Sequence, residues 1–279
     1  MITLHRVNHS PGLLAPERSL AASEHPLACR IAWASDIRLD LYAGLPAEDQ
    51  HTTRGNHIER LGAAWAREST ADLLLITGGI STSVGLAEQL TDLQRGWGRR
   101  IAFVVGDSDR LFSKRAVVDD MLRRLQVEAP GLIWLTEAEP IELSPRCALV
   151  GADSFCNTSR ANDVRILEQG IRGAEAGERT LLAALALYDE VLFATHDPPW
   201  RHLVLPPADR SAWYVQCEAG EMGEMIQRVA RAHPRKKVRV LCGAVREAAD
   251  FDIAPNLACS TAASVERHPT IFTHVDLPR

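Results

Sequence analysis

Residues 191–199 read Val-Leu-Phe-Ala-Thr-His-Asp-Pro-Pro, an apolar run that ends in a histidine and a proline-rich turn. Four more apolar runs end in short polar or glycine-containing loops, which begin at Ser35, Thr77, Gly106 and Cys242. A short, unbroken apolar run is typical of a strand that is buried on both faces. We therefore expect five buried strands.

Between the first of these apolar runs lie segments whose apolar residues have helical spacing. Over residues 52–67, for example, Ile58, Leu61, Ala64 and Trp65 recur on one helical face. This alternation of short buried strands and helices predicts a layered α/β fold. Further helices are expected over residues 84–95, 113–127, 158–188 and 220–232, hairpin strands at 132–135, 141–143 and 147–150, and closing strands at 257–260 and 270–275.

The length of 279 residues and the hydrophobic content of 46% are compatible with one large domain. We expect residues 29–279 to form that domain. Residues 1–28, which contain Pro11, Pro16 and Pro26 and show no clear period, are expected to be an irregular N-terminal extension.

The net charge of −5 argues against a general nucleic-acid-binding protein, which usually presents a basic face. No apolar stretch has the length of a signal peptide or a membrane span, so the expected location is the cytoplasm. None of the six cysteines has C-x-x-C spacing, which disfavours a zinc ribbon. Cys147, Cys242 and Cys259 lie in apolar runs and are expected to be buried.

The order and setting of the five loops resemble the motifs of the calcineurin-like metallophosphoesterases. That family reads D-x-H, G-D, G-N-H-D, a lone His before a proline-rich turn, and G-H-x-H. The corresponding loops here read Asp36-Ile-Arg38, Gly78-Gly79, Gly106-Asp-Ser-Asp109, His196-Asp-Pro-Pro199 and Gly243-Ala-Val-Arg246. The resemblance implies a four-layer α-β-β-α sandwich in one domain, with the five loops around one cleft at the ends of neighbouring strands.

The resemblance also implies which residues stand where the family has seven metal ligands: Asp36, Arg38, Gly79, Asp107, His196, Ala244 and Arg246. Only Asp36, Asp107 and His196 have side chains that can ligate a metal, since an arginine keeps its proton. Gly79 replaces the carboxylate that bridges the two metals. We therefore expect no cofactor, or at most one weakly bound Mn or Zn ion, because two ligands rarely hold such a metal.

Each retained residue also has a plainer interpretation. Asp36 could cap its own loop through its side-chain oxygens, and His196 could be a hydrogen-bonded structural histidine. Asp109 and Arg110 could likewise be a solvated pair. Ser108 stands where the family has the histidine that assists the leaving group, and serine is a poor proton donor.

Arg38 and Arg246 bring permanent positive charges to a site that keeps Asp36 and Asp107. One interpretation is charge compensation, in which the arginines pair with the carboxylates that the lost metals would strand. The other is an anion pocket made of Arg38, Arg246 and Ser108. We favour charge compensation.

The sequence thus indicates a metallophosphoesterase-like protein without its dinuclear metal site, which is a pseudoenzyme with a binding, regulatory or scaffold role. The alternative is a phosphoric ester hydrolase with altered chemistry, either mononuclear at Asp107 and His196 or metal-free. The expected partner is a phosphate- or carboxylate-bearing small molecule or another protein. Neither general nucleic-acid binding nor membrane binding is expected.

Overall fold

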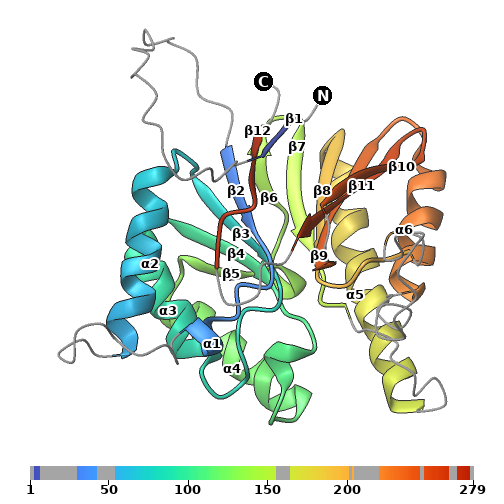
Figure 1. Ribbon diagram of the computed structural model, residues 1–279. Coiled ribbons are helices and arrows are strands. Elements are labelled where there is room, and N and C mark those ends of the chain that lie inside the picture. Colours follow the sequence, from blue (N-terminus) through green and yellow to red (C-terminus); the bar gives the residue numbers. More distant parts are fainter. Residues whose placement is uncertain are drawn as a thin grey trace, which may run out of the picture.

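The computed structural model describes residues 3–6, 30–42, 54–154, 164–200, 203, 220–245, 248–263 and 269–276. Two six-stranded sheets pack face to face in the middle of the molecule, and helices cover their outer faces (Figure 1). The helices are α1 (Leu39–Tyr42), α2 (Arg54–Glu68), α3 (Leu86–Trp97), α4 (Arg115–Glu128), α5 (Val164–Leu187) and α6 (Gly220–Ala232), with 3-10 turns η1 (Ser108–Arg110) and η2 (Leu135–Glu137).

The first sheet has a parallel centre and an antiparallel edge. Its strands, in spatial order, are β1 (Thr3–Arg6), β12 (Thr273–Asp276), β2 (Arg30–Ala34), β3 (Leu73–Thr77), β4 (Arg100–Val104) and β5 (Leu132–Trp134). Strands β2 to β5 are parallel to one another, and β12 is antiparallel to both β2 and β1.

The second sheet is parallel except at its two edges. Its order is β10 (Ala249–Ala254), β11 (Leu257–Ala263), β9 (Lys237–Val245), β8 (Glu190–Thr195), β7 (Cys147–Gly151) and β6 (Ile141–Ser144). Strands β10 and β6 are the antiparallel edges, paired with β11 and β7. Parallel strands at the centre agree with the unbroken apolar runs of the sequence.

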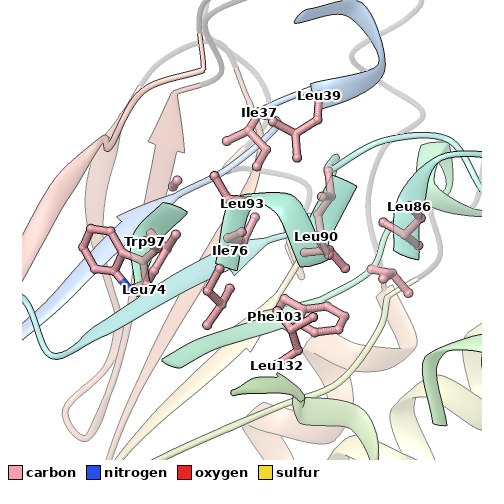
Figure 2. Packing of buried hydrophobic residues seen from close by; sticks show 14 of the residues in the cluster. Ile37, Leu39, Leu74, Ile76, Leu86, Leu90, Leu93, Trp97, Phe103 and Leu132 are labelled. Atoms are coloured by element: carbon pink, nitrogen blue, oxygen red, sulfur yellow. The ribbon is translucent and has the colours of Figure 1, made fainter. Parts of the chain in front are cut away.

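Three buried clusters separate the four layers. Side chains alternate along each strand, so Ile31 and Trp33 of β2 pack between the sheets while Ala32 and Ala34 face the helices α2 to α4. Figure 2 shows the helix-side cluster of the first sheet, where α3 residues such as Leu90 and Trp97 lie over β3 and β4. A third cluster fills the space between the second sheet and α5 and α6. The predicted α-β-β-α sandwich is confirmed.

The hairpins predicted between residues 132 and 150 are only partly found. Strands β6 and β7 form a hairpin, but β5 pairs in parallel with β4 and belongs to the other sheet. The sequence spacing of short strands does not show which sheet each one joins. The edge strand β10 was not predicted, because aspartates occupy its exposed positions.

The irregular N-terminal extension also needs a correction. Thr3–Arg6 is a strand, β1, paired antiparallel with β12 at the opposite end of the sequence. Four residues carry too little periodicity to reveal such a strand, whose partner is distant in the sequence. Residues 7–29 lie outside the described part of the chain. Among the described helices, none has both the length and the apolar character needed to cross a bilayer. Cys147, Cys242 and Cys259 are buried, as predicted.

Candidate functional site

Loops from both sheets meet at the carboxyl ends of the central strands. Parallel pairing places the ends of β2, β3 and β4 at one edge of the first sheet and those of β8 and β9 at one edge of the second. We call the segments at these ends the loop cluster: residues 35–38, 77–81, 105–110, 195–197 and 243–245. Three of the five predicted motifs lie wholly within it, the fourth extends beyond it to Pro199, and the last also includes Arg246.

Hydrogen bonds hold these loops directly against one another. The N–H of Arg38 donates to the carbonyl of Gly79 at 2.9 Å, and the N–H of Gly243 donates to the carbonyl of His196 at 2.9 Å. His196 Nδ1 is 2.7 Å from the carbonyl oxygen of Thr77. The described residues therefore confirm that segments from both sheets converge on one site.

His196 is buried at the centre of the loop cluster. Its Nδ1–H donates to the Thr77 carbonyl, and its Nε2 faces Asp36 Oδ1 at 3.9 Å. A Cβ added to Gly106 would overlap the imidazole ring, so this close approach requires glycine. Burial opposes the charge on the ring, but the charges of Asp36 and Asp197 outweigh it and raise the pKa of His196 to about 9.

Asp36 is held by protein donors. Its Oδ2 accepts hydrogen bonds from the Ala244 N–H at 2.9 Å and from the Ser35 hydroxyl at 2.8 Å. Asp36 and Ala244 both have left-handed backbones, with φ of 51° and 54°. The carboxylate thus ties the first loop to the last one, which is close to the capping role that the sequence suggested.

Gly79 leaves no space for the bridging carboxylate. Its φ is 63°, and a Cβ built there would lie 2.5 Å from Asp36 Oδ1 and 2.7 Å from Asp36 Cα. Any side chain at this position would overlap the backbone of the first loop. Moreover, no three His, Cys, Asp or Glu residues in the described ranges converge to hold a metal ion. A dinuclear centre does not fit this arrangement.

Asp109 is the residue that sequence reasoning misjudged most. It is completely buried, and its carboxylate accepts four backbone N–H bonds of 2.7–3.0 Å, from Gly79, Ile80, Ser81 and Gly106. Burial raises its pKa to about 6, and the N–H donors oppose that shift. The available signal was its place as the final Asp of the G-N-H-D motif. Asp109 holds the second and third loops together.

Arg110 is buried too, so the interpretation of a solvated pair is wrong. Its Nη1 and Nη2 donate to Asp119 of α4 and to Asp153 after β7, each at 2.6 Å. Asp153 also accepts hydrogen bonds from the indole N–H of Trp134 and the hydroxyl of Thr136. This buried network joins the third loop to the second sheet.

Two further carboxylates lie near His196. Asp107 is exposed, and its carboxylate forms no hydrogen bond or ion pair with any residue in the described part of the chain. The surrounding protein atoms nevertheless raise its pKa to about 7, and the charge of Asp197 adds to the shift. Asp197 is buried, accepts a hydrogen bond from the Ser154 hydroxyl at 3.0 Å, and has a pKa raised by burial. Asp197 was not among the predicted site residues.

Arg38 does not pair as predicted. Its Nε and Nη2 bind both oxygens of Asp40 at 3.0 and 2.8 Å, instead of pairing with Asp36 or Asp107. The negative charges of Asp109 and Asp36 also act on the guanidinium at longer range. Ser108 begins the turn η1 in the same loop cluster, whereas Arg246 lies outside the described residues. The anion pocket therefore stays a prediction.

No protein-family model matches the chain, and no curated protein matches it. Solved structures do match. A dimetal phosphatase from Danio rerio has a TM-score of 0.54 and 15% identity, over 88% of this chain and 91% of that one. The protein TT1561 from Thermus thermophilus has a TM-score of 0.52 and 13% identity, over 85% of this chain and 89% of that one. The chain therefore has a metallophosphoesterase-type fold.

Proposed function

We propose that this chain, with its metallophosphoesterase-type fold, is a pseudoenzyme that binds a partner and does not hydrolyse phosphate esters. The observation that carries the proposal is the contact between Gly79 and Asp36. Two-metal hydrolysis needs two cations a few ångströms apart to activate a water and to neutralise the transition state. Here the backbone of Asp36 fills the place of the bridging carboxylate.

The remaining polar groups support a structural role for the loop cluster. Asp36 and Asp109 are engaged by protein N–H groups, and the ring of His196 is fixed by the Thr77 carbonyl. Ser108 supplies no proton donor of suitable pKa for a leaving group. Hydrogen bonds between the loops thus hold the site together without any metal.

The negative charge of the loop cluster affects which kind of partner can bind. Asp36, Asp107 and Asp197 surround His196, and the guanidinium of Arg38 is already bound to Asp40. Above the pKa of Asp107, which is about 7, the carboxylates outnumber the single imidazolium of His196, and the excess negative charge repels a phosphate or a second carboxylate. We therefore favour a protein partner over an anionic small molecule.

A mononuclear hydrolase is the second candidate. It is favoured by one observation, namely that Asp107 and His196 are still close enough to influence each other's charge. Such an enzyme would use these two residues as its only protein ligands. It would need further ligands from the solvent or the substrate.

Metal analysis and an activity assay distinguish the two candidates. The purified protein is incubated with Mn²⁺ or Zn²⁺, desalted and analysed for bound metal, and is then assayed on an aryl phosphate diester. We expect well under one equivalent of metal, and a rate equal to that of the His196→Gln variant. One tightly bound metal, with hydrolysis that this variant loses, would establish the mononuclear enzyme. Two bound metals would refute the proposal.

A further inference from the structure

Helix α5 exposes two apolar side chains that lie on one face. The helix covers the outer side of the second sheet next to α6 (Figure 1), and its residues Ala174 and Leu181 are buried in that contact. Away from the contact, Ile171 is 43% exposed and Leu182 is 39% exposed. These two residues are about three helical turns apart, so their side chains lie on the same face of α5.

Two residues of opposite charge lie between them on this face. Glu175 and Arg179 are both exposed and stand about one helical turn apart. Their side chains form no hydrogen bond or ion pair with any residue in the described ranges. Glu178, in contrast, turns toward α6, where it accepts hydrogen bonds from Nη1 and Nη2 of Arg228 at 2.7 and 2.9 Å. We call the four exposed residues the α5 stripe: Ile171, Glu175, Arg179 and Leu182.

The α5 stripe is complementary to itself. Along the chain it reads apolar, acidic, basic, apolar, so an antiparallel copy presents its basic position to the acidic one. A two-fold axis halfway between Glu175 and Arg179 places Glu175 beside the partner's Arg179 and Ile171 beside the partner's Leu182. Because a two-fold interface repeats each contact, two ion pairs are flanked by two apolar contacts. A parallel, in-register pairing would instead set glutamate against glutamate, which is repulsive.

We propose that the α5 stripe is the interface of a homodimer, in which α5 packs antiparallel on α5 of a second copy of this chain. The apolar contacts supply the affinity, because exposed ion pairs contribute little to it. The charges set the orientation, because every other register brings like charges together or leaves them without a partner. The inference goes beyond the proposed function and does not rest on it, since no residue of the α5 stripe belongs to the loop cluster.

Charge reversal tests the pairing, with the full chain in sedimentation equilibrium over a range of micromolar concentrations. We expect a monomer–dimer equilibrium for the wild type. Glu175→Arg and Arg179→Glu should each raise the dissociation constant at least about tenfold, because like charges then face each other at both ends of the interface. The double variant Glu175→Arg/Arg179→Glu exchanges the two charges and restores both pairs. Its dissociation constant should return to within about threefold of the wild-type value.

Matched controls separate the α5 stripe from the rest of the surface. Glu128→Arg makes the same charge change at an exposed position of α4, in the opposite helix layer, and should leave the dissociation constant unchanged. Leu182→Gln should weaken the dimer at least about tenfold, since the apolar contact is lost twice. Leu187→Gln should have no effect, because Leu187 is 72% exposed on α5 but points away from the stripe. Far-UV circular dichroism of each variant should match the wild type, because the altered side chains are exposed.

Three results would overturn the inference. A wild-type chain that stays monomeric over the whole range would show that no second copy occupies the α5 stripe. A dimer that neither single reversal weakens would use another face of the molecule. A double variant that dimerises more weakly than both single variants would show that Glu175 and Arg179 do not face each other. None of these results depends on metal content or hydrolysis, so a failure of this inference is distinguishable from a failure of the proposed function.

Discussion

At the scale of single residues, hydrogen bonds from backbone N–H groups and a hydroxyl hold two carboxylates of the loop cluster. Asp36 accepts hydrogen bonds from the Ala244 N–H and the Ser35 hydroxyl, and Asp109 accepts four backbone N–H bonds. Carboxylates that are buried away from counter-ions are costly unless such donors surround them. Because these donors belong to different loops, the packing of the loops depends on the two acceptor side chains, Asp36 and Asp109.

Gly79→Ala should therefore destabilise the protein more than Gly98→Ala. Both glycines are left-handed, with φ of 63° and 69°, but a Cβ meets Asp36 at position 79 and nothing within 4 Å at position 98. We expect a cost of roughly 1–2 kcal/mol for the backbone strain at either position, and about 1–3 kcal/mol more at position 79 for the overlap. Urea unfolding measures both. Equal costs would show that the first two loops can separate.

Asp109→Asn tests the four N–H bonds. The amide nitrogen of asparagine is a donor and would face backbone N–H groups, which leaves at least one buried donor without an acceptor. The free energy of unfolding should fall by about 3 kcal/mol or more. Asp120→Asn, which alters an exposed pair with Arg124, should change it by less than about 0.5 kcal/mol. A similar small effect at position 109 would contradict the proposed role of this carboxylate.

At the scale of elements, the buried network around Arg110 links η1 and α4 to the strand β7. Both of its ion pairs are 2.6 Å long, and Asp153 is completely buried. The network fixes the segment that contains Asp107 and Phe112.

Arg110→Ala should be strongly destabilising, because it leaves Asp153 as a buried charge without its cation. The expected cost is about 3–5 kcal/mol. The exposed pair between Arg123 and Glu137 provides the comparison, and Arg123→Ala should cost less than about 1 kcal/mol. Thermal or urea unfolding of both variants tests the difference. If the two variants were equally stable, the third loop would not depend on the network.

At the scale of the whole molecule, the loop cluster binds more protons when folded than when unfolded. The pKa values of His196, Asp107 and Asp109 are raised to about 9, 7 and 6, and that of Asp197 is also raised. All four shifts have the same sign, since burial of like charges favours the protonated forms of the acids and neighbouring carboxylates favour the imidazolium.

The stability of the metal-free protein should accordingly fall as the pH rises from about 5 to 9. The stabilisation from His196 is complete below about pH 6.5, the value for an unfolded histidine, and is lost as the pH approaches 9. Urea unfolding in the presence of a chelator measures the slope. His196→Gln should have a flatter slope above pH 6.5. Stability that increases over this range would contradict the assigned shifts.

The pattern of residue types is enough to predict the layered fold and the positions of the five loops. The apolar run 191–195 is too short for a typical helix, and it forms the buried strand β8 of a sheet that is covered on both faces. The sequence also predicts that Gly79 and Arg38 cannot bind a metal ion, because the ability to bind a metal depends on the type of side chain.

Only the tertiary structure decided which partners the retained residues have. The burial of Asp109 and Arg110 and the pairing of Arg38 with Asp40 depend on segments brought together by the folded sheets or on local backbone geometry. Hydrophobic periodicity carries no information about these contacts. The sequence shows that Gly79 has no side chain, whereas only the folded backbone shows that a side chain there would overlap Asp36, because that overlap arises between loops from two strands.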